Sequence, residues 1–233
     1  MDAATSESQP NPPKQSPRGR QLALVGAGLI ALAIAGGAWM VGNYYSRRAE
    51  SYTKVAPRIG KNAPFIKTPD LVVDQMVEMS GLKPGDIAYD LGCGDGRIII
   101  TAALKTGCRG VGFDIDPKRV AEARENVRLH GVEDLVEIRQ QDVFTVDLRE
   151  AKVVLMYLLP WMNQKLVPQF RQMKPGSRVI AHDFNLGDAE ELKPEKTVTV
   201  TIASPSADGQ SVEHLVHRWI MPLRPAADRN HQP

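Results

Sequence analysis

Residues 87–97 read Ile-Ala-Tyr-Asp-Leu-Gly-Cys-Gly-Asp-Gly-Arg, an apolar run that reaches an acid and then three glycines at every second position. Apolar residues resume at once in 98–103. The pattern predicts a strand, a tight loop and a helix. Glycines in such a loop adopt left-handed backbone angles and let a ligand approach the backbone, and the first N–H groups of the helix remain unpaired. We therefore expect a flat, polar ligand to bind across this loop.

The spacing of these glycines distinguishes between classes of nucleotide ligand. A dinucleotide fingerprint has the form G-x-G-x-x-G and places a pyrophosphate at the helix N-terminus. Here the form is acid-x-G-x-G-x-G, and Asp90 and Asp95 would repel a diphosphate. The sequence therefore favours a ligand with a cationic head and without phosphate.

Two later apolar runs are also followed by an acid. Asp114 follows the run at 110–113, and Asp142 comes shortly after the run at 135–138. Asp114 is placed like the acid that accepts hydrogen bonds from ribose hydroxyls after the second strand of nucleotide-binding sheets. Because parallel strands present their carboxyl ends at one edge of a sheet, the three acids outline one site.

These motifs together resemble those of class I S-adenosylmethionine-dependent methyltransferases. Residues 90–96 are similar to their first motif, 112–116 to their second and 141–143 to the motif on the adenine side. The resemblance implies that the first acid and the glycines lie near the methionine part of the cofactor, that the second acid binds the ribose and that the third meets the adenine amino group. On this basis the cofactor-binding residues are Asp90, Gly92, Gly94, Gly96, Asp114, Asp142 and Val143. The alternatives are a Rossmann-type domain for another nucleotide and a degenerate domain that binds nothing.

A narrower resemblance covers roughly residues 64–188. The stretches 64–69 and 157–160, together with a single apolar segment ahead of the domain, look like the membrane-anchored protein-lysine methyltransferases that act on the ATP synthase c-subunit and the adenine nucleotide translocase. Lys67 and Thr68 depart from the pattern of those enzymes. The resemblance implies a lysine of a membrane protein as the methyl acceptor.

The fourth and fifth predicted strands, 152–157 and 176–181, should end at the same edge of the sheet. Aromatic faces such as those of Tyr157 and Trp161 can hold an ammonium group by cation–π attraction. Each of these aromatic residues could instead pack in the core, and His182, at the end of the fifth strand, could be only a hydrogen-bonding residue rather than a catalytic one. Our candidates for catalytic residues are Tyr157, Pro160, Asn163 and His182.

The N-terminal part of the chain differs in composition from the rest. Residues 1–20 contain four prolines and almost no large apolar side chain, so we expect a disordered tail. Residues 21–46 carry no charge, and a transmembrane helix over 21–45 is long enough to cross a bilayer. The alternative is a cleaved signal peptide with its cleavage site at 33–35.

Charge is distributed unevenly along the chain. Residues 1–61 hold eight Lys or Arg and three acids, which leaves 21 Lys or Arg against 24 acids in the remainder. The remainder therefore has no basic bias, and we expect no nucleic-acid partner. Cys93 and Cys108 give neither a disulfide framework nor a ligand set for a metal, so no metal is expected.

The whole pattern predicts an α/β protein, a Rossmann-like seven-stranded methyltransferase sheet with helices on both faces, preceded by one N-terminal transmembrane helix. The first helix should begin at Thr68 as its cap, and the stretches 197–202 and 212–221 should form a terminal hairpin that makes one strand antiparallel. The expected parts are a disordered tail (1–20), the transmembrane helix (21–45), a juxtamembrane linker (46–63), the methyltransferase domain (64–222) and a loose tail (223–233).

The expected function is therefore that of a membrane-anchored enzyme that transfers a methyl group from S-adenosylmethionine to a lysine of a membrane protein. Basic residues on both sides of the apolar segment and the cytosolic supply of cofactor favour a single-pass protein with its catalytic domain on the cytoplasmic side. Two alternatives remain: methylation of a lipid-soluble small molecule, and an inactive scaffold that binds the cofactor within a membrane assembly.

Overall fold

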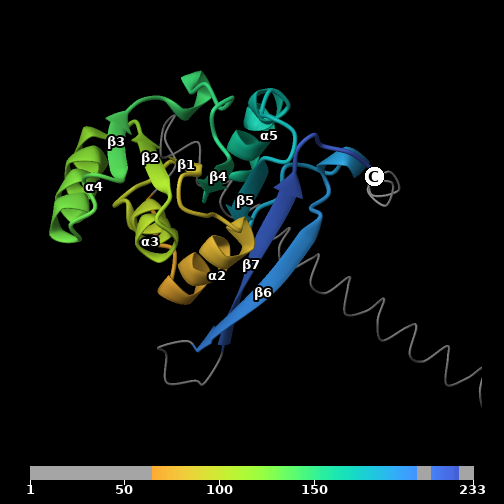
Figure 1. Cartoon of the computed structure of the whole chain (residues 1–233). Coiled ribbons are helices and arrows are strands. Elements are labelled where there is room, and N and C mark those ends of the chain that lie inside the picture. The colour runs from red at the N-terminus through yellow and green to blue at the C-terminus, as the bar shows by residue number, and fades with distance from the viewer. Residues whose placement is uncertain (1–64, 204–210, 226–233) are drawn as a thin grey trace, which may run out of the picture. The chain divides into compact units, whose positions relative to one another are not determined.

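The computed structural model describes residues 65–203 and 211–225, and Figure 1 shows the arrangement of their helices and strands. Strands and helices alternate as far as β5, and two long strands follow at the C-terminal end. The elements are α2 (Asp70–Ser80), β1 (Ile87–Leu91), α3 (Arg97–Thr106), β2 (Arg109–Asp114), α4 (Pro117–Leu129), β3 (Val136–Gln140), η1 (Val143–Thr145), β4 (Val153–Met156), α5 (Pro160–Phe170), β5 (Arg178–His182), η2 (Glu190–Leu192), β6 (Lys196–Ala203) and β7 (Ser211–Ile220).

One seven-stranded sheet organises these elements, in the order β3-β2-β1-β4-β5-β7-β6. Strand β7 runs antiparallel to both of its neighbours, and the remaining pairs are parallel. Figure 1 shows β6 and β7 as the long pair at one side of the sheet. The predicted sheet of seven strands with one antiparallel member is therefore confirmed.

Helices cover both faces of the sheet. Apolar side chains of α2, α3 and α4 pack in one buried cluster, and those of α5 pack in a second. Strand β4 contributes to both: Val153 and Leu155 belong to the first cluster, and Val154 and Met156 belong to the second. This alternation reflects the period of two in a strand and explains why β4 is apolar throughout.

The start of α2 differs from its prediction. Pro69 is the N-cap residue, and no side chain caps the helix. Thr68 is instead buried, with its Oγ1 3.4 Å from Nδ1 of His182 at the end of β5. The predicted capping role of Thr68 is therefore wrong, because its hydroxyl contacts a side chain from a distant strand. The C-terminal end of α2 is as predicted, because Gly81 ends the helix with a left-handed φ of 58°.

Several expectations concern residues outside the described part of the chain. These are the tail (1–20), the transmembrane helix (21–45), the linker (46–63) and most of the C-terminal tail (223–233). Within 65–203 and 211–225, none of the helices combines the length and the apolar character that crossing a bilayer requires.

Candidate active site

A cavity of about 620 Å³ is lined by residues that follow β1, β2, β3 and β4. Its volume lies in the range of small-molecule sites. The convergence of these strand ends at one edge is what the sequence predicts. Charged residues of the wall are Asp95, Arg97, Asp114, Asp116, Arg119, Asp142 and Lys165, and aromatic residues of the wall are Phe65, Phe144, Tyr157 and Trp161.

The glycine loop between β1 and α3 is held against β2 by backbone hydrogen bonds. The N–H groups of Gly92 and Cys93 donate to the carbonyl oxygen of Phe113, at 2.8 and 2.9 Å. Gly94 has a φ of 56°, and a Cβ at this position would lie 2.3 Å from the ring of Phe65. Only glycine therefore fits beneath Phe65 without displacing the ring.

Two acids of the cavity wall are fixed by backbone N–H groups. Oδ2 of Asp114 accepts a hydrogen bond from Gly94 at 2.9 Å, and Oδ1 accepts one from Asp116 at 3.0 Å. The side chain of Asp142 caps η1 by accepting from the N–H of Phe144 at 3.0 Å. Because a carboxylate oxygen has two lone pairs, each acid can still accept a hydrogen bond from a ligand.

Asp90 lies beneath the glycine loop and is fully buried. Neither of its carboxylate oxygens has a hydrogen-bond partner in the described chain. Burial, reinforced by the charge of Asp114, raises the pKa of Asp90 from 3.8 to about 8. The N–H of Ile99 at the start of α3 lowers this pKa in part, although it does not reach hydrogen-bonding geometry. A cationic group in the cavity would favour the ionised carboxylate.

Residues 65–69 form a short segment, here called the strap, that contributes Phe65, Ile66 and Thr68 to the cavity wall. Arg97, the first residue of α3, donates from Nη1 to the carbonyl oxygen of Thr68 at 3.1 Å. The same guanidinium lies 2.6 Å from Oδ2 of Asp95. Burial alone would raise the pKa of Asp95, but the hydrogen bonds and charge of Arg97 outweigh it and lower the pKa. The Asp95–Arg97 pair thus ties the strap to the glycine loop.

The candidates for the acceptor side occupy different environments. Tyr157 lines the cavity, and its ring centroid lies 3.9 Å from that of His182. Asn163 is fully buried in α5, where its Nδ2 donates to the carbonyl oxygens of Phe184 and Asn185 at 3.1 and 3.2 Å. Asn163 therefore fixes the chain that follows β5.

The structure brings about half of the predicted site residues to the cavity surface. Those that line it are Gly92, Asp114, Asp142, Val143 and Tyr157. Those behind or beside it are Asp90, Gly94, Gly96, Pro160, Asn163 and His182. Gly94 and Gly96 shape the loop with positive φ angles, and Pro160 begins α5.

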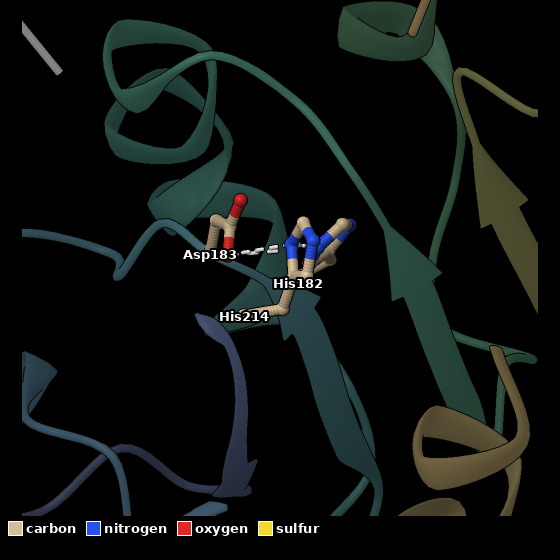
Figure 2. A group of neighbouring side chains, drawn as sticks. All are labelled: His182, Asp183 and His214. Atoms are coloured by element: carbon tan, nitrogen blue, oxygen red, sulfur yellow. Dashed lines mark hydrogen bonds and ion pairs between the residues drawn. The ribbon is translucent and has the colours of Figure 1, made fainter. Parts of the chain in front are cut away.

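His182 belongs to a buried cluster that the sequence alone does not reveal. Figure 2 shows its imidazole beside Asp183 and His214, with the three side chains pointing toward one another. His214 lies on β7, and only the antiparallel pairing of β5 with β7 brings it to this position. Asp183 has a φ of 60°, a left-handed conformation that is uncommon outside glycine. No local pattern signals His214.

The comparisons with known proteins agree with this geometry. Residues 90–193 match the ANTKMT methyltransferase domain. A protein-lysine N-methyltransferase from Saccharolobus islandicus is 42% identical over 127 residues, which are 54% of this chain and 79% of that protein. The chain belongs to the protein-lysine methyltransferase family. An ATP synthase C-subunit lysine N-methyltransferase from Xenopus laevis is 30% identical to this methyltransferase over 159 residues, 67% of each chain.

A solved structure is also similar to this methyltransferase. It is described as an RNA methyltransferase from Salinibacter ruber in complex with S-adenosyl-L-homocysteine, with 46% identity and a TM-score of 0.58, and the match covers 68% of this chain and 95% of that one. S-adenosylmethionine is accordingly the cofactor of this methyltransferase. The site fits that cofactor, because the buried carboxylate of Asp90 has no hydrogen-bond partner in the described chain and would be stabilised by a cationic ligand, and because Asp114 and Asp142 of the wall can accept hydrogen bonds.

Proposed function

We propose that this methyltransferase modifies a lysine side chain of a membrane protein, and that a helix over residues 21–45 anchors it with its catalytic domain on the cytoplasmic side. The main observation in support of lysine as the methyl acceptor is the 42% identity to the Saccharolobus enzyme, which is named as a protein-lysine N-methyltransferase. The name of the Xenopus relative, which specifies a lysine of a protein subunit, supports the same acceptor group.

The walls of the cavity suit transfer to an amine. When bound, S-adenosylmethionine supplies an electrophilic methyl group on a sulfonium. The protein then has to align a neutral amine with that group and exclude water. Tyr157 lines the cavity, and the neighbouring Trp161 has 36% of its surface exposed. Their aromatic faces can attract the ammonium form of the side chain as it enters, and the amine becomes reactive after it loses a proton.

The sequence of the first 61 residues supports the membrane part of the proposal. An uncharged stretch covers 21–46, and five basic residues follow it before residue 62, against three ahead of it. Because more basic residues follow the uncharged stretch than precede it, the catalytic domain, which follows the stretch, is favoured on the cytoplasmic side. A tether of this kind raises the local concentration of substrates in the same membrane. A lipid-soluble small molecule would gain from the tether equally.

RNA is a second candidate acceptor because the Salinibacter structure, at 46% identity, is described as an RNA methyltransferase. The charge of this chain argues against RNA. Residues 62–233 carry 21 Lys or Arg and 24 acids, whereas binding to phosphates requires a basic surface. An inactive scaffold that only binds the cofactor is the remaining alternative.

A labelling experiment distinguishes these acceptors. Membranes and cytosol from cells that lack the enzyme are incubated with methyl-labelled S-adenosylmethionine and the full-length protein, and label is counted in protein, lipid extract and RNA. We expect label in membrane protein, and mass spectrometry should place it on lysine. Label confined to lipid or RNA would replace the proposed acceptor, and none in any fraction would favour the scaffold. The negative control is the Asp114→Ala variant, which we expect to bind the cofactor too weakly to transfer label.

A further inference from the structure

The cluster of His182, Asp183 and His214 lies one side chain away from the cofactor cavity. Tyr157, which lines the cavity, packs against His182 with the two rings tilted by 37°, and it donates from its hydroxyl to Oδ2 of Asp183 at 3.4 Å. The side chains of His182 and Asp183 have no exposed surface, and that of His214 is 10% exposed. Two imidazoles and a carboxylate are therefore gathered in a nearly dry site.

Three donor atoms of this cluster form a closed triangle. Nε2 of His182 and Nδ1 of His214 are 2.9 Å apart, and each lies 3.5 Å from Oδ1 of Asp183. A zinc ion binds imidazole nitrogen and carboxylate oxygen at about 2.0–2.2 Å, so two such ligands in tetrahedral geometry are separated by about 3.3–3.6 Å. The two carboxylate distances fall in this range, and the distance between the imidazoles needs to open by only about 0.4 Å.

The spacing within the triangle suits a shared ion. The contact between the two imidazoles has a normal hydrogen-bond length, whereas 3.5 Å from each ring to Oδ1 of Asp183 is long for a hydrogen bond and normal for two ligands of one ion. A single ion between the three atoms would contact all of them at once. Two imidazoles with one carboxylate are also a common ligand set for first-row divalent metals.

The surroundings of the triangle resemble the outer shell of a metal site. The other ring nitrogen of His182, Nδ1, lies 3.4 Å from the hydroxyl of buried Thr68. The N–H of Leu215 donates to Oδ1 of Asp183 at 3.1 Å. Such contacts orient metal ligands and set the histidine tautomer. The left-handed backbone of Asp183 is a strained feature of the kind found at functional sites.

We propose that His182, Asp183 and His214 bind one zinc ion or a similar first-row divalent cation, with a fourth position left for water. The sequence does not predict this site, because no local spacing places His214 near His182. The ion joins the end of β5 to β7 and fixes the side chains against which Tyr157 packs. This inference concerns the stability and shape of the site, and it does not depend on which acceptor the enzyme methylates.

The test uses the full-length protein, stripped with a chelator and then titrated with Zn²⁺ and Co²⁺. We expect one equivalent of tightly bound metal, visible absorption from Co²⁺ in four-coordinate geometry, and a melting temperature that rises with Zn²⁺ and falls again with chelator. Failure of the wild-type protein to bind one equivalent, or a Co²⁺ spectrum of the six-coordinate aqueous type, would overturn the proposal and leave a hydrogen-bonded network only.

Matched variants assign the ion to this cluster. Asp183→Asn removes the ligand charge while asparagine tolerates the left-handed backbone. His214→Gln is paired with His217→Gln. His217 is a histidine of the same strand with similar burial, and its Nε2 lies 3.3 Å from the backbone oxygen of Asp183 but supplies no atom to the triangle. We expect the first two variants to lose at least about tenfold in Zn²⁺ affinity and His217→Gln to retain it. Undiminished binding in both Asp183→Asn and His214→Gln would place the metal elsewhere and refute the site.

Discussion

The backbone N–H of Gly94 lies 2.9 Å from Oδ2 of Asp114, so one carboxylate both supports the glycine loop and faces the cavity. Asp114→Ala removes this support together with the predicted acceptor for ligand hydroxyls. Hydrogen bonds to charged groups contribute about 1.5–3 kcal/mol each, so losing two should lower affinity for S-adenosylhomocysteine about 100-fold or more. Calorimetric titration measures this change, with Asp134→Ala at an exposed position as the control. Equal affinities in the two variants would remove Asp114 from the site.

Gly94→Ala and Gly131→Ala form a matched pair. Both glycines have left-handed φ angles, of 56° and 65°, but a Cβ at Gly94 would clash with the ring of Phe65 whereas none of the neighbouring atoms lies within 4 Å of one at Gly131. Each change should cost about 1–2 kcal/mol of stability from backbone strain. Only Gly94→Ala should also weaken cofactor binding, because it displaces the strap. Adding Phe65→Ala to Gly94→Ala should recover part of the affinity.

Asp90 should make stability depend on pH. Its pKa is raised from 3.8 to about 8 in the folded protein, so between these values the folded state retains a proton that the unfolded state has lost. Stability contributed by this proton is therefore present at low pH and lost as pH rises, by at most about 1.4 kcal/mol per unit, until the folded state also ionises near pH 8. Denaturant titrations from pH 5 to 8 should show this slope in the wild type and a shallower one in Asp90→Asn. Parallel slopes would contradict the assignment.

Cofactor binding should release a proton from Asp90 near neutral pH. A cationic ligand close to the loop lowers the pKa of this buried acid and so favours its ionised form. Calorimetry in buffers of different ionisation enthalpy measures the protons released, and we expect up to about one per cofactor at pH 7. Asp90→Asn should release none. Equal release by both proteins would assign the proton to another group.

Tyr157 offers a test of the acceptor side. Tyr157→Phe keeps the aromatic face over His182 and removes only the hydroxyl that meets Asp183. Tyr157→Ala also removes the face, and loss of a cation–π contact of about 2 kcal/mol should lower kcat/KM for a lysine substrate about thirtyfold. The alanine variant should therefore be much less active than the phenylalanine variant. Unchanged turnover in both would exclude Tyr157 from the site.

Local signals are sufficient to predict which residues gather at the cavity edge. The glycines follow β1, Asp114 ends β2 and Asp142 lies two residues after β3, and parallel packing then brings them to one edge. Thr68 was misassigned because Thr-Pro-Asp is a normal helix start, while its actual partner His182 is 114 residues away in the chain. His214 was missed for the same reason, since its contact with His182 joins two strands across 32 residues.

Strands β1 to β3 and strands β4 and β5 contribute different kinds of residue to the cavity. Residues at the ends of β1, β2 and β3 supply the glycine loop and the acids Asp114 and Asp142, whereas Tyr157 after β4 packs against residues at the end of β5. Under the proposed function, substitutions around Tyr157 would change acceptor preference while the glycine loop and its acids continued to bind the cofactor. Relatives would then diverge in the molecules that they modify and keep the cofactor in common.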